Sequence, residues 1–400
     1  MKQLLFQKIF FKTNHYDSNN KDKYDIDTEV MARHYTSVEI MDIIQEVMNE
    51  KIQKRFQTND TNKADNHEKK VISCLNALAF KIDSFHKQQR TTKTITNDER
   101  EMNDGEQMKT YQISQEASYT ILQLYPSNDE VISASYSLLA MCANSPILRE
   151  RHLKMKENCD ISIPIDIMKS SLDRTKSYVP NISAHNRDTY DDDEEQMAAE
   201  LQRKGCIYLG ALSDGSSEIA THIVQCGGLE RILDSIDWFR YHIHVINWAL
   251  WSIFNICFDN VYNKGEFIRC NGIEIVCRVM KNVLCCEDVK DNTLKEDDNE
   301  QELLEVARHG SAILFDLLRI DTASVQGNHE KTTLNIIQTR NIALNAGLHE
   351  VLLLSMKKFQ SDTQIISMGN EILIATGFKG VIPFVQGSIL CKSHDLKLDQ

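Results

Sequence analysis

The feature that most constrains the fold is a short pattern that recurs along the chain. The nonapeptide GCIYLGALS, which begins at Gly205, aligns with ALWSIFNIC, which begins at Ala249, 44 residues later. Each copy opens with a small residue, followed by leucine or isoleucine four and seven residues further on, a spacing that places these side chains on one helical face. The small residue and the leucine four positions after it return from Ser135, Gly310 and Gly369. This repetition predicts stacked helical units, because one such unit is too small to bury its own apolar face.

Each unit is expected to contain three helices, with a glycine break before the second. The break is Gly227-Gly228 ahead of the apolar run 229–236, and glycine stands at the corresponding point at Gly272 and Gly347. Only five prolines occur in 400 residues, and valine-rich alternating runs are few. The chain is therefore predicted to be all-helical rather than a sheet protein.

The most regular third helix is predicted over 244–257. Its apolar residues occupy one face, and a second stripe about a third of a turn away contains Trp248, Trp251 and Asn255. A helix with two such stripes is either enclosed by neighbours on both sides or has one packing face and one binding face.

These residues resemble the armadillo-repeat family, whose third helix often reads AxWALxNL and whose second helix follows a glycine pair. Trp251-x-x-x-Asn255 is similar to the element with which nuclear-import adaptors of that family hold extended peptides. The resemblance extends over about 115–385 and is clearest over 195–282. It implies an all-α fold, a right-handed α-solenoid of armadillo/HEAT-like three-helix repeats. The family period of about 40–47 residues agrees with the 44-residue step.

In such an array the third helices line a concave wall, so residues aligned with Trp251 and Asn255 are expected to face one groove. An asparagine amide can donate to and accept from a peptide backbone, and tryptophan rings can flank a side-chain stem. The alternative is that the tryptophans pack against the adjacent repeat while Asn255 bonds neighbouring backbone. Only one of five aligned rungs carries the Trp/Asn pair, and both interpretations stay open here. The groove candidates are Trp248, Trp251, Asn255, Ile207, Ala211, Ala312 and Asp316.

Charge and cysteine usage limit the class of protein. A net charge of −13 argues against general nucleic-acid binding, which needs a basic face, and is compatible with basic protein partners. The eleven cysteines form no CxxC pattern, and most stand at apolar helix positions, so a reducing compartment, the cytoplasm or the nucleus, is expected. The N-terminus MKQLLFQKIFFK is too short to span a bilayer, and no integral membrane segment is expected.

No catalytic or cofactor motif stands out. A glycine-rich phosphate loop, a GxSxG elbow and HExxH are all absent from the sequence. His242 and His244, two residues apart, do not share a helical face and make a poor metal pair, and the vicinal Cys285-Cys286 is expected to have one exposed and one buried thiol. We therefore expect no enzyme activity, no metal and no cofactor.

The expected organisation has four parts. These are a flexible segment 1–35, a helical cap with a polar loop over 36–110, a repeat array over 111–386 with an acidic insertion at about 286–302, and a tail 387–400. Within the cap, helices are predicted at 37–55 and 70–85, with a polar break at 58–69 and a loop at 87–110. Within the array, helices are predicted at 130–143, 148–156, 163–172 and 303–320, with a polar loop at 321–334. The acidic insertion is expected to be a solvated loop or, alternatively, a docking site for a basic segment.

The sequence thus predicts a non-enzymatic protein–protein interaction scaffold or adaptor that binds a peptide segment in the concave groove. Two alternatives are a nuclear-transport-type cargo adaptor and a regulatory subunit of an enzyme. The oligomeric state does not follow from the sequence.

Overall fold

The described residues are helical, as predicted, and contain no strand. The computed structural model describes residues 36–54, 61–91, 97–144, 160–178, 192–285, 296–318 and 336–380. The chain divides into two compact units, Met1–Ser235 and Ile236–Gln400, and the division falls within helix α11. The two units are described in turn.

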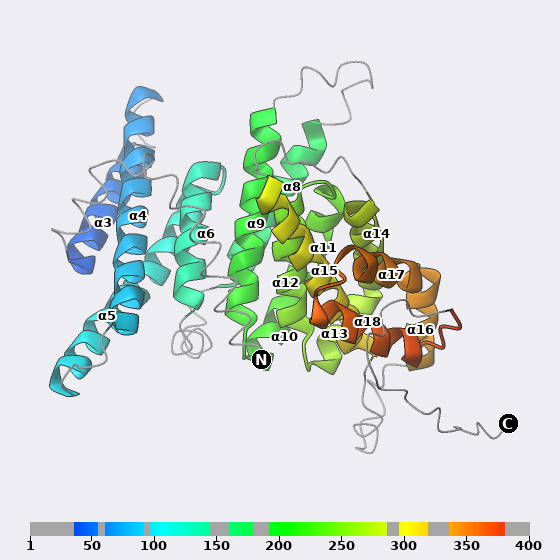
Figure 1. The fold of residues 1–400 in the computed structure, drawn as a ribbon. Coiled ribbons are helices and arrows are strands. Elements are labelled where there is room, and N and C mark those ends of the chain that lie inside the picture. Colours follow the sequence, from blue (N-terminus) through cyan, green and yellow to red (C-terminus); the bar gives the residue numbers. More distant parts are fainter. Residues whose placement is uncertain are drawn as a thin grey trace. The chain divides into compact units, whose positions relative to one another are not determined.

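Unit 1 begins with three mutually packed helices. Helix α3 contacts both α4 and α5, and these two helices also contact each other and α6 (Figure 1). Further along, α6 and α8 each pack against α9, and α10 also contacts α9. The helices of this unit are α3 Ser37–Lys54, α4 Thr61–Thr91, α5 Asn97–Leu124, α6 Asp129–Ala143, α8 Ser162–Tyr178, α9 Asp192–Ser213, α10 Ser217–Gln225 and the larger part of α11 Gly228–Trp238.

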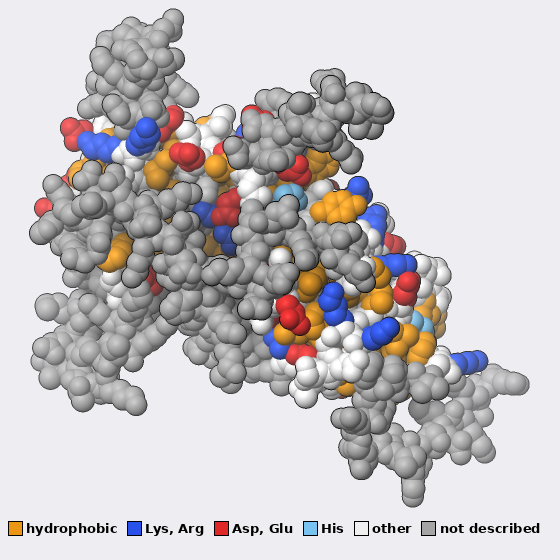
Figure 2. Space-filling model, turned by 45° about the horizontal axis from the view of Figure 1, so that its top comes forward, with side chains coloured by type: hydrophobic (Ala, Val, Ile, Leu, Met, Phe, Trp, Pro, Cys, Tyr) orange, Lys and Arg blue, Asp and Glu red, His pale blue; other side chains and the backbone are white. Residues whose placement is uncertain are grey.

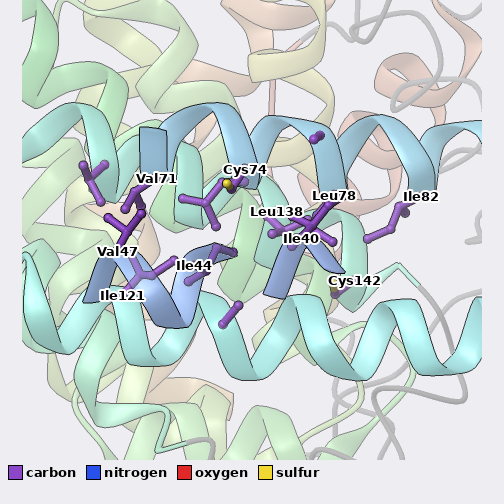
Figure 3. Close-up of a cluster of buried hydrophobic side chains, with 14 of the residues drawn as sticks. Ile40, Ile44, Val47, Val71, Cys74, Leu78, Ile82, Ile121, Leu138 and Cys142 are labelled. Carbon is purple, nitrogen blue, oxygen red and sulfur yellow. The ribbon is translucent and has the colours of Figure 1, made fainter. Parts of the chain in front are cut away.

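The core of the first helices in unit 1 is apolar. Side chains of α3 and α4 point toward one another in Figure 3, and residues of α5 and α6 complete the cluster. Ile44, Leu75 and Leu78 are fully buried there. Burying one such side chain contributes about 1.5–3 kcal/mol, so this cluster supplies much of the driving force for the association of these helices.

Unit 2 repeats one packing arrangement along the chain. Helix α15 contacts both α12 and α18, and α14 contacts α17. Third helices therefore pack against third helices, and second helices against second helices. The elements, in chain order after the end of α11, are α12 Ile243–Cys257, α13 Val261–Arg269, α14 Gly272–Cys285, α15 Glu296–Leu318, α16 Ile336–Asn345, α17 Leu348–Lys358 and α18 Thr363–Ala375.

The small residue that opens the recurring pattern marks a close helix crossing in both units. A Cβ placed on Gly205 of α9 would lie 2.5 Å from Sδ of Met168 on α8, and one on Gly310 of α15 would lie 2.2 Å from Sδ of Met280 on α14. At Gly369 of α18 the corresponding contact, at 2.5 Å, is with the methionine of α17. The small residue is therefore needed because a second-helix methionine occupies the space of its missing side chain.

The predicted glycine breaks are single residues in the left-handed region. Gly227 has φ +82° and Gly347 has φ +85°. At the corresponding point of the next repeat Asn271 takes the same conformation, with φ +56°, which asparagine tolerates better than most residues. The left-handed residue thus separates the first and second helices of a repeat.

Three sequence predictions about loops are wrong where the structure describes the residues. Residues 61–69 and 87–91 belong to α4, 97–110 belong to α5, and 296–302 form the first turns of α15. These segments are polar, but they hold no proline and a single glycine, so nothing in them stops a helix. In α15 the acidic residues also lie at the positive end of the helix, which stabilises it.

The ends of other helices differ less from their predicted positions. Helix α8 continues to Tyr178, six residues beyond its predicted end at Leu172, whereas α3 and α6 lie within a residue of their predicted limits. The predicted helix 148–156, the segment 1–35 and the tail 387–400 lie outside the described residues, as do 286–295 and 321–334.

Candidate functional site

The stripe of α12 that was predicted to face a groove is almost completely buried. Trp248, Trp251 and Asn255 are exposed to 3%, 5% and 7%. The two indole rings meet edge to face, with centroids 5.5 Å apart and an interplanar angle of 84°. This burial agrees with the interpretation that α12 is enclosed, and contact of these residues with a peptide stays a prediction.

The other groove candidates lie on α9 and α15. In unit 1, Ala211 is buried and Ile207 is half-buried on α9. In unit 2, Ala312 and Asp316 are half-buried on α15, the helix that packs against α12. The structure therefore brings the candidates of α12 and α15 together within one unit, and those of α9 belong to the other.

Asp316 already has a cation partner inside the molecule. Lys264 of α13 places Nζ 3.0 Å from Oδ2 of Asp316 and also donates to its backbone carbonyl at 3.1 Å. Burial raises the pKa of the Asp316 carboxyl, and the nearby Lys264 ammonium opposes that shift. The Asp316 carboxylate is therefore already paired with Lys264 and is not an open acceptor for a basic partner.

A polar network connects α12 with α15. It lies on the N-terminal side of Trp251 in α12 and of Asp316 in α15. Asn247 Nδ2 donates to Glu302 Oε2, and His244 Nδ1 lies 3.2 Å from Glu302 Oε1. The other end of the Asn247 amide meets His309, with Nδ1 2.9 Å from Oδ1. Asn247 and His309 are buried, while His244 and Glu302 keep 27% and 13% of their side chains exposed.

The same stripe of α15 continues toward α18. Arg308 Nη1 lies 2.7 Å from Glu305 Oε1, and its Nε donates to Asp362 Oδ2 at 2.9 Å. Asp362 is also the N-cap of α18, where Oδ1 accepts from the amides of Gln364 and Ile365 at 3.1 and 2.9 Å. We call His244, Asn247, Glu302, Glu305, Arg308, His309 and Asp362 the polar strip.

Burial shifts the pKa values of Glu305 and His309, two buried residues of the polar strip. Burial raises the pKa of Glu305, and the Arg308 guanidinium opposes this shift. Burial, aided by Arg308, lowers the pKa of His309 to about 3, so this imidazole is neutral at physiological pH. Two atoms, Glu305 Oε2 and His309 Nε2, are buried without a hydrogen-bond partner among the residues that the structure describes.

The polar strip was missed by the sequence analysis, although one signal was present. Glu302, Glu305 and His309 recur at helical spacing and lead into Ala312 and Asp316, which were recognised. The sequence predicts that this helix begins at Leu303, which leaves Glu302 in a loop. The partners on α12 and α18 lie more than fifty residues away in sequence and could not be inferred locally.

The remaining candidates for chemistry are side chains that could bind a metal and the cysteine thiols. In the part of the chain that the structure describes, no group of three or more His, Cys, Asp or Glu side chains could hold a metal ion. Cys285 is exposed, and its neighbour Cys286 lies outside the described residues. Burial raises the pKa of Cys74 to about 11 and of Cys277 to about 12, which keeps both thiols protonated and inert.

Membrane and charge properties can be stated for the same residues. None of the helices in the described ranges combines the length and the apolar character that a membrane crossing requires. On the face drawn in Figure 2, basic and acidic side chains are interspersed with hydrophobic ones. Among the side chains coloured there, the acidic ones do not form a single patch.

Comparison with known proteins supports the fold alone. The crystal structure of Uso1-1 matches with a TM-score of 0.50 and 12% sequence identity, over 87% of this chain and 48% of that one. The crystal structure of Uso1-2 matches with a TM-score of 0.48 and 12% identity, over 87% of this chain and 46% of that one. The chain thus spans about half the length of these structures. No protein-family model matches the sequence, and no curated protein matches it either.

Proposed function

We propose that this protein is a non-enzymatic interaction scaffold or adaptor that binds a segment of another protein along its third helices. Its architecture would be a right-handed α-solenoid of armadillo/HEAT-like three-helix repeats. The observation that carries the proposal is the packing of α12, α15 and α18 in sequence in unit 2, accompanied by α14 against α17. Arrays of this kind offer extended surfaces rather than a single cleft.

The repeated glycine–methionine crossing supports the same architecture. Gly310 and Gly369 each receive a methionine from the preceding second helix, at distances of 2.2 and 2.5 Å from the ideal Cβ position. A crossing that recurs at the same point of successive repeats keeps successive third helices in equivalent orientations. Side chains on one stripe of each third helix would then form a continuous surface.

Along that stripe, contact with a partner is expected where side chains remain accessible. Trp251 and Asn255 would support the surface from within, since they are 5% and 7% exposed. His244 and Glu302, at the edge of the polar strip, would meet the partner directly. Basic protein segments are the expected partners, the cytoplasm or nucleus the expected location, and no cofactor or nucleic acid is required.

Affinity purification of the full chain from cells, followed by quantitative mass spectrometry, tests the proposal. The test variant is His244→Ala/Asn255→Ala, and the matched control is Lys281→Ala/Glu350→Ala, which removes an ion pair of 2.8 Å between α14 and α17. Circular dichroism first establishes that both variants keep the wild-type helix content. Loss of a defined set of partners in the test variant alone is the expected result.

Equal partner sets for the wild type and both variants would contradict binding along the third helices. Turnover in broad hydrolase or nucleotide-binding screens of the purified chain would contradict the non-enzymatic assignment. The two outcomes are separate, because the first concerns the surface and the second the class of protein.

A further inference from the structure

The polar strip contains buried hydrogen-bonding capacity that the described residues leave unused. Glu305 is 5% exposed and His309 is 3% exposed. Glu305 Oε2 and His309 Nε2 have no partner in the described ranges, and neither does Asn299 Oδ1 one to two turns earlier on α15. An unmet polar atom in the interior costs about 1–3 kcal/mol, so these three atoms on one helix, beside the likewise unpaired Ser311 hydroxyl, call for an explanation.

All three atoms are acceptors. Asn247 must direct its NH₂ group at Glu302, because a carboxylate only accepts, and this turns Asn247 Oδ1 toward His309. His309 therefore donates from Nδ1, and its neutral ring leaves a lone pair on Nε2. The amide oxygen of Asn299 and the carboxylate oxygen of Glu305 are acceptors by their chemistry.

The charge of the polar strip has the sign that favours a cation. Its three carboxylates, Glu302, Glu305 and Asp362, face one guanidinium, that of Arg308, while His309 is neutral. Residues 302, 305 and 309 share one stripe of α15, since positions three and four apart are neighbours on a helix. Open acceptors beside excess negative charge fit a group that carries several N–H donors and a positive charge.

We propose that the polar strip of α12 and α15 is a subsite for the ammonium or guanidinium group of a lysine or arginine in a partner protein. Glu302 and Glu305 would neutralise the charge, and His309 Nε2 would accept one of its N–H groups. Asn299 would extend the row of acceptors. This inference rests on the proposed function and assigns its basic-partner preference to named atoms of α15 rather than to the acidic insertion as a whole.

The geometry suits a long, flexible side chain. His244 and Glu302 form the accessible edge, with 27% and 13% of their side chains exposed, whereas Glu305 and His309, which carry open acceptors, are 5% and 3% exposed. Lysine and arginine carry their charge on a stem of several methylene groups that can pass such an edge while the partner's backbone stays outside. An anion is disfavoured, because the three carboxylates would repel it and the open atoms of Glu305 and His309 have no hydrogen to donate to it.

Fluorescence anisotropy with labelled, end-capped hexalysine and hexaarginine tests the subsite on the full-length protein. The test variants are Glu302→Gln and Glu305→Gln, which preserve side-chain size. The matched controls are Glu266→Gln and Glu350→Gln, which remove the same charge from ion pairs on α13 and α17 of unit 2. Hexalysine with acetylated side chains controls for the loss of the ammonium group.

We expect each test variant to bind hexalysine or hexaarginine about tenfold more weakly than the wild type, and each control to change affinity less than about twofold. Equal losses in all four variants would show that only overall charge matters and would overturn the subsite. Failure of the wild type to bind either peptide would also overturn it, since a buried water would then suffice for the open acceptors. If Glu305→Gln lost peptide affinity but kept its cellular partners, the subsite would stand apart from the proposed function.

Discussion

Helices α9 and α15, one in each unit, treat buried polar groups differently. In unit 1, Gln202 of α9 is fully buried, and both ends of its amide are engaged: Nε2 donates to the Met168 carbonyl at 2.9 Å, and Oε1 accepts from Ser235 at 2.7 Å. In unit 2, the third helix α15 buries Glu305 and His309 with one atom of each unpaired among the described residues. Similar helices in a similar role thus enclose a completed network in one case and an incomplete one in the other.

We infer from this difference that Gln202 serves the stability of the fold, whereas Glu305 serves binding. Gln202 ties α9 to α8 and α11, so it has a structural purpose that needs no other partner. Glu305 is held in a position where burial disfavours its charge. A stack of helices does not require such a carboxylate, as the apolar cluster of α3 to α6 demonstrates (Figure 3). We therefore attribute it to a contact outside the described residues.

The largest expected effect lies in the apolar cluster of unit 1. Leu78→Ala removes a fully buried side chain and is expected to cost about 2–5 kcal/mol of unfolding free energy. Phe80→Ala on the same helix serves as control, because Phe80 is 38% exposed and should matter far less. Urea denaturation followed by circular dichroism measures both, and equal losses would show that the cluster is not the core of this region.

A feature that both units share gives the next effect. Gly205→Leu and Gly310→Leu each force a side chain into the space of a second-helix methionine and should cost about 1–3 kcal/mol. Pairing Gly310→Leu with Met280→Ala should restore part of the loss, because the methionine then vacates the site. The thermal unfolding midpoints of the single and double variants measure this coupling. Additive losses would mean that the two residues do not meet.

Gln202 tests the completed network. Gln202→Ala leaves the Met168 carbonyl short of one partner and leaves the Ser235 hydroxyl with the Arg231 carbonyl as its acceptor, and a loss of about 1–3 kcal/mol is expected. The same urea titration applies. A variant as stable as the wild type would remove the contrast between the units.

Acid should weaken unit 2 through His309. Its folded-state pKa is about 3, below the 6.5 of an unperturbed histidine. The contribution of the neutral ring is therefore complete above pH 6.5 and is lost as the pH falls from 6.5 toward 3. Glu305, with a raised pKa, acts in the opposite sense, and Glu302, Arg308 and Asp362 are the other charges nearby.

Thermal unfolding at about pH 7 and about pH 5 is expected to show a smaller decline for His309→Gln than for the wild type. If both proteins lose the same stability between these values, other groups govern the acid response.

Much of the helical organisation could be predicted from the sequence, because apolar periodicity reports it directly. Helices α3, α6 and α12 follow regular spacing and start or end at clear caps or turns, such as Asn128 before α6. The first turns of α5 and α15 were missed because their surfaces are polar, and polarity without glycine or proline does not distinguish a loop from an exposed helix.

The candidate site was less predictable than the fold. The stripe of α12 was recognised from its two tryptophans, but its burial depends on packing that no local pattern encodes. Lys264 and Asp316 are 52 residues apart, and Asn247 and His309 are 62 apart. Such pairs follow from the register between helices, which depends on loops whose lengths vary from repeat to repeat.

The smallest expected change in stability belongs to Glu305→Gln, which is also the most direct test of the central claim. The measurement is the unfolding midpoint of this variant together with its affinity for end-capped hexalysine and hexaarginine. Because burial disfavours the Glu305 charge, the account predicts a midpoint equal to or above that of the wild type, with binding to one of these peptides weakened about tenfold. A lower midpoint with unchanged affinity for both peptides would show that Glu305 serves the fold, and would contradict the account.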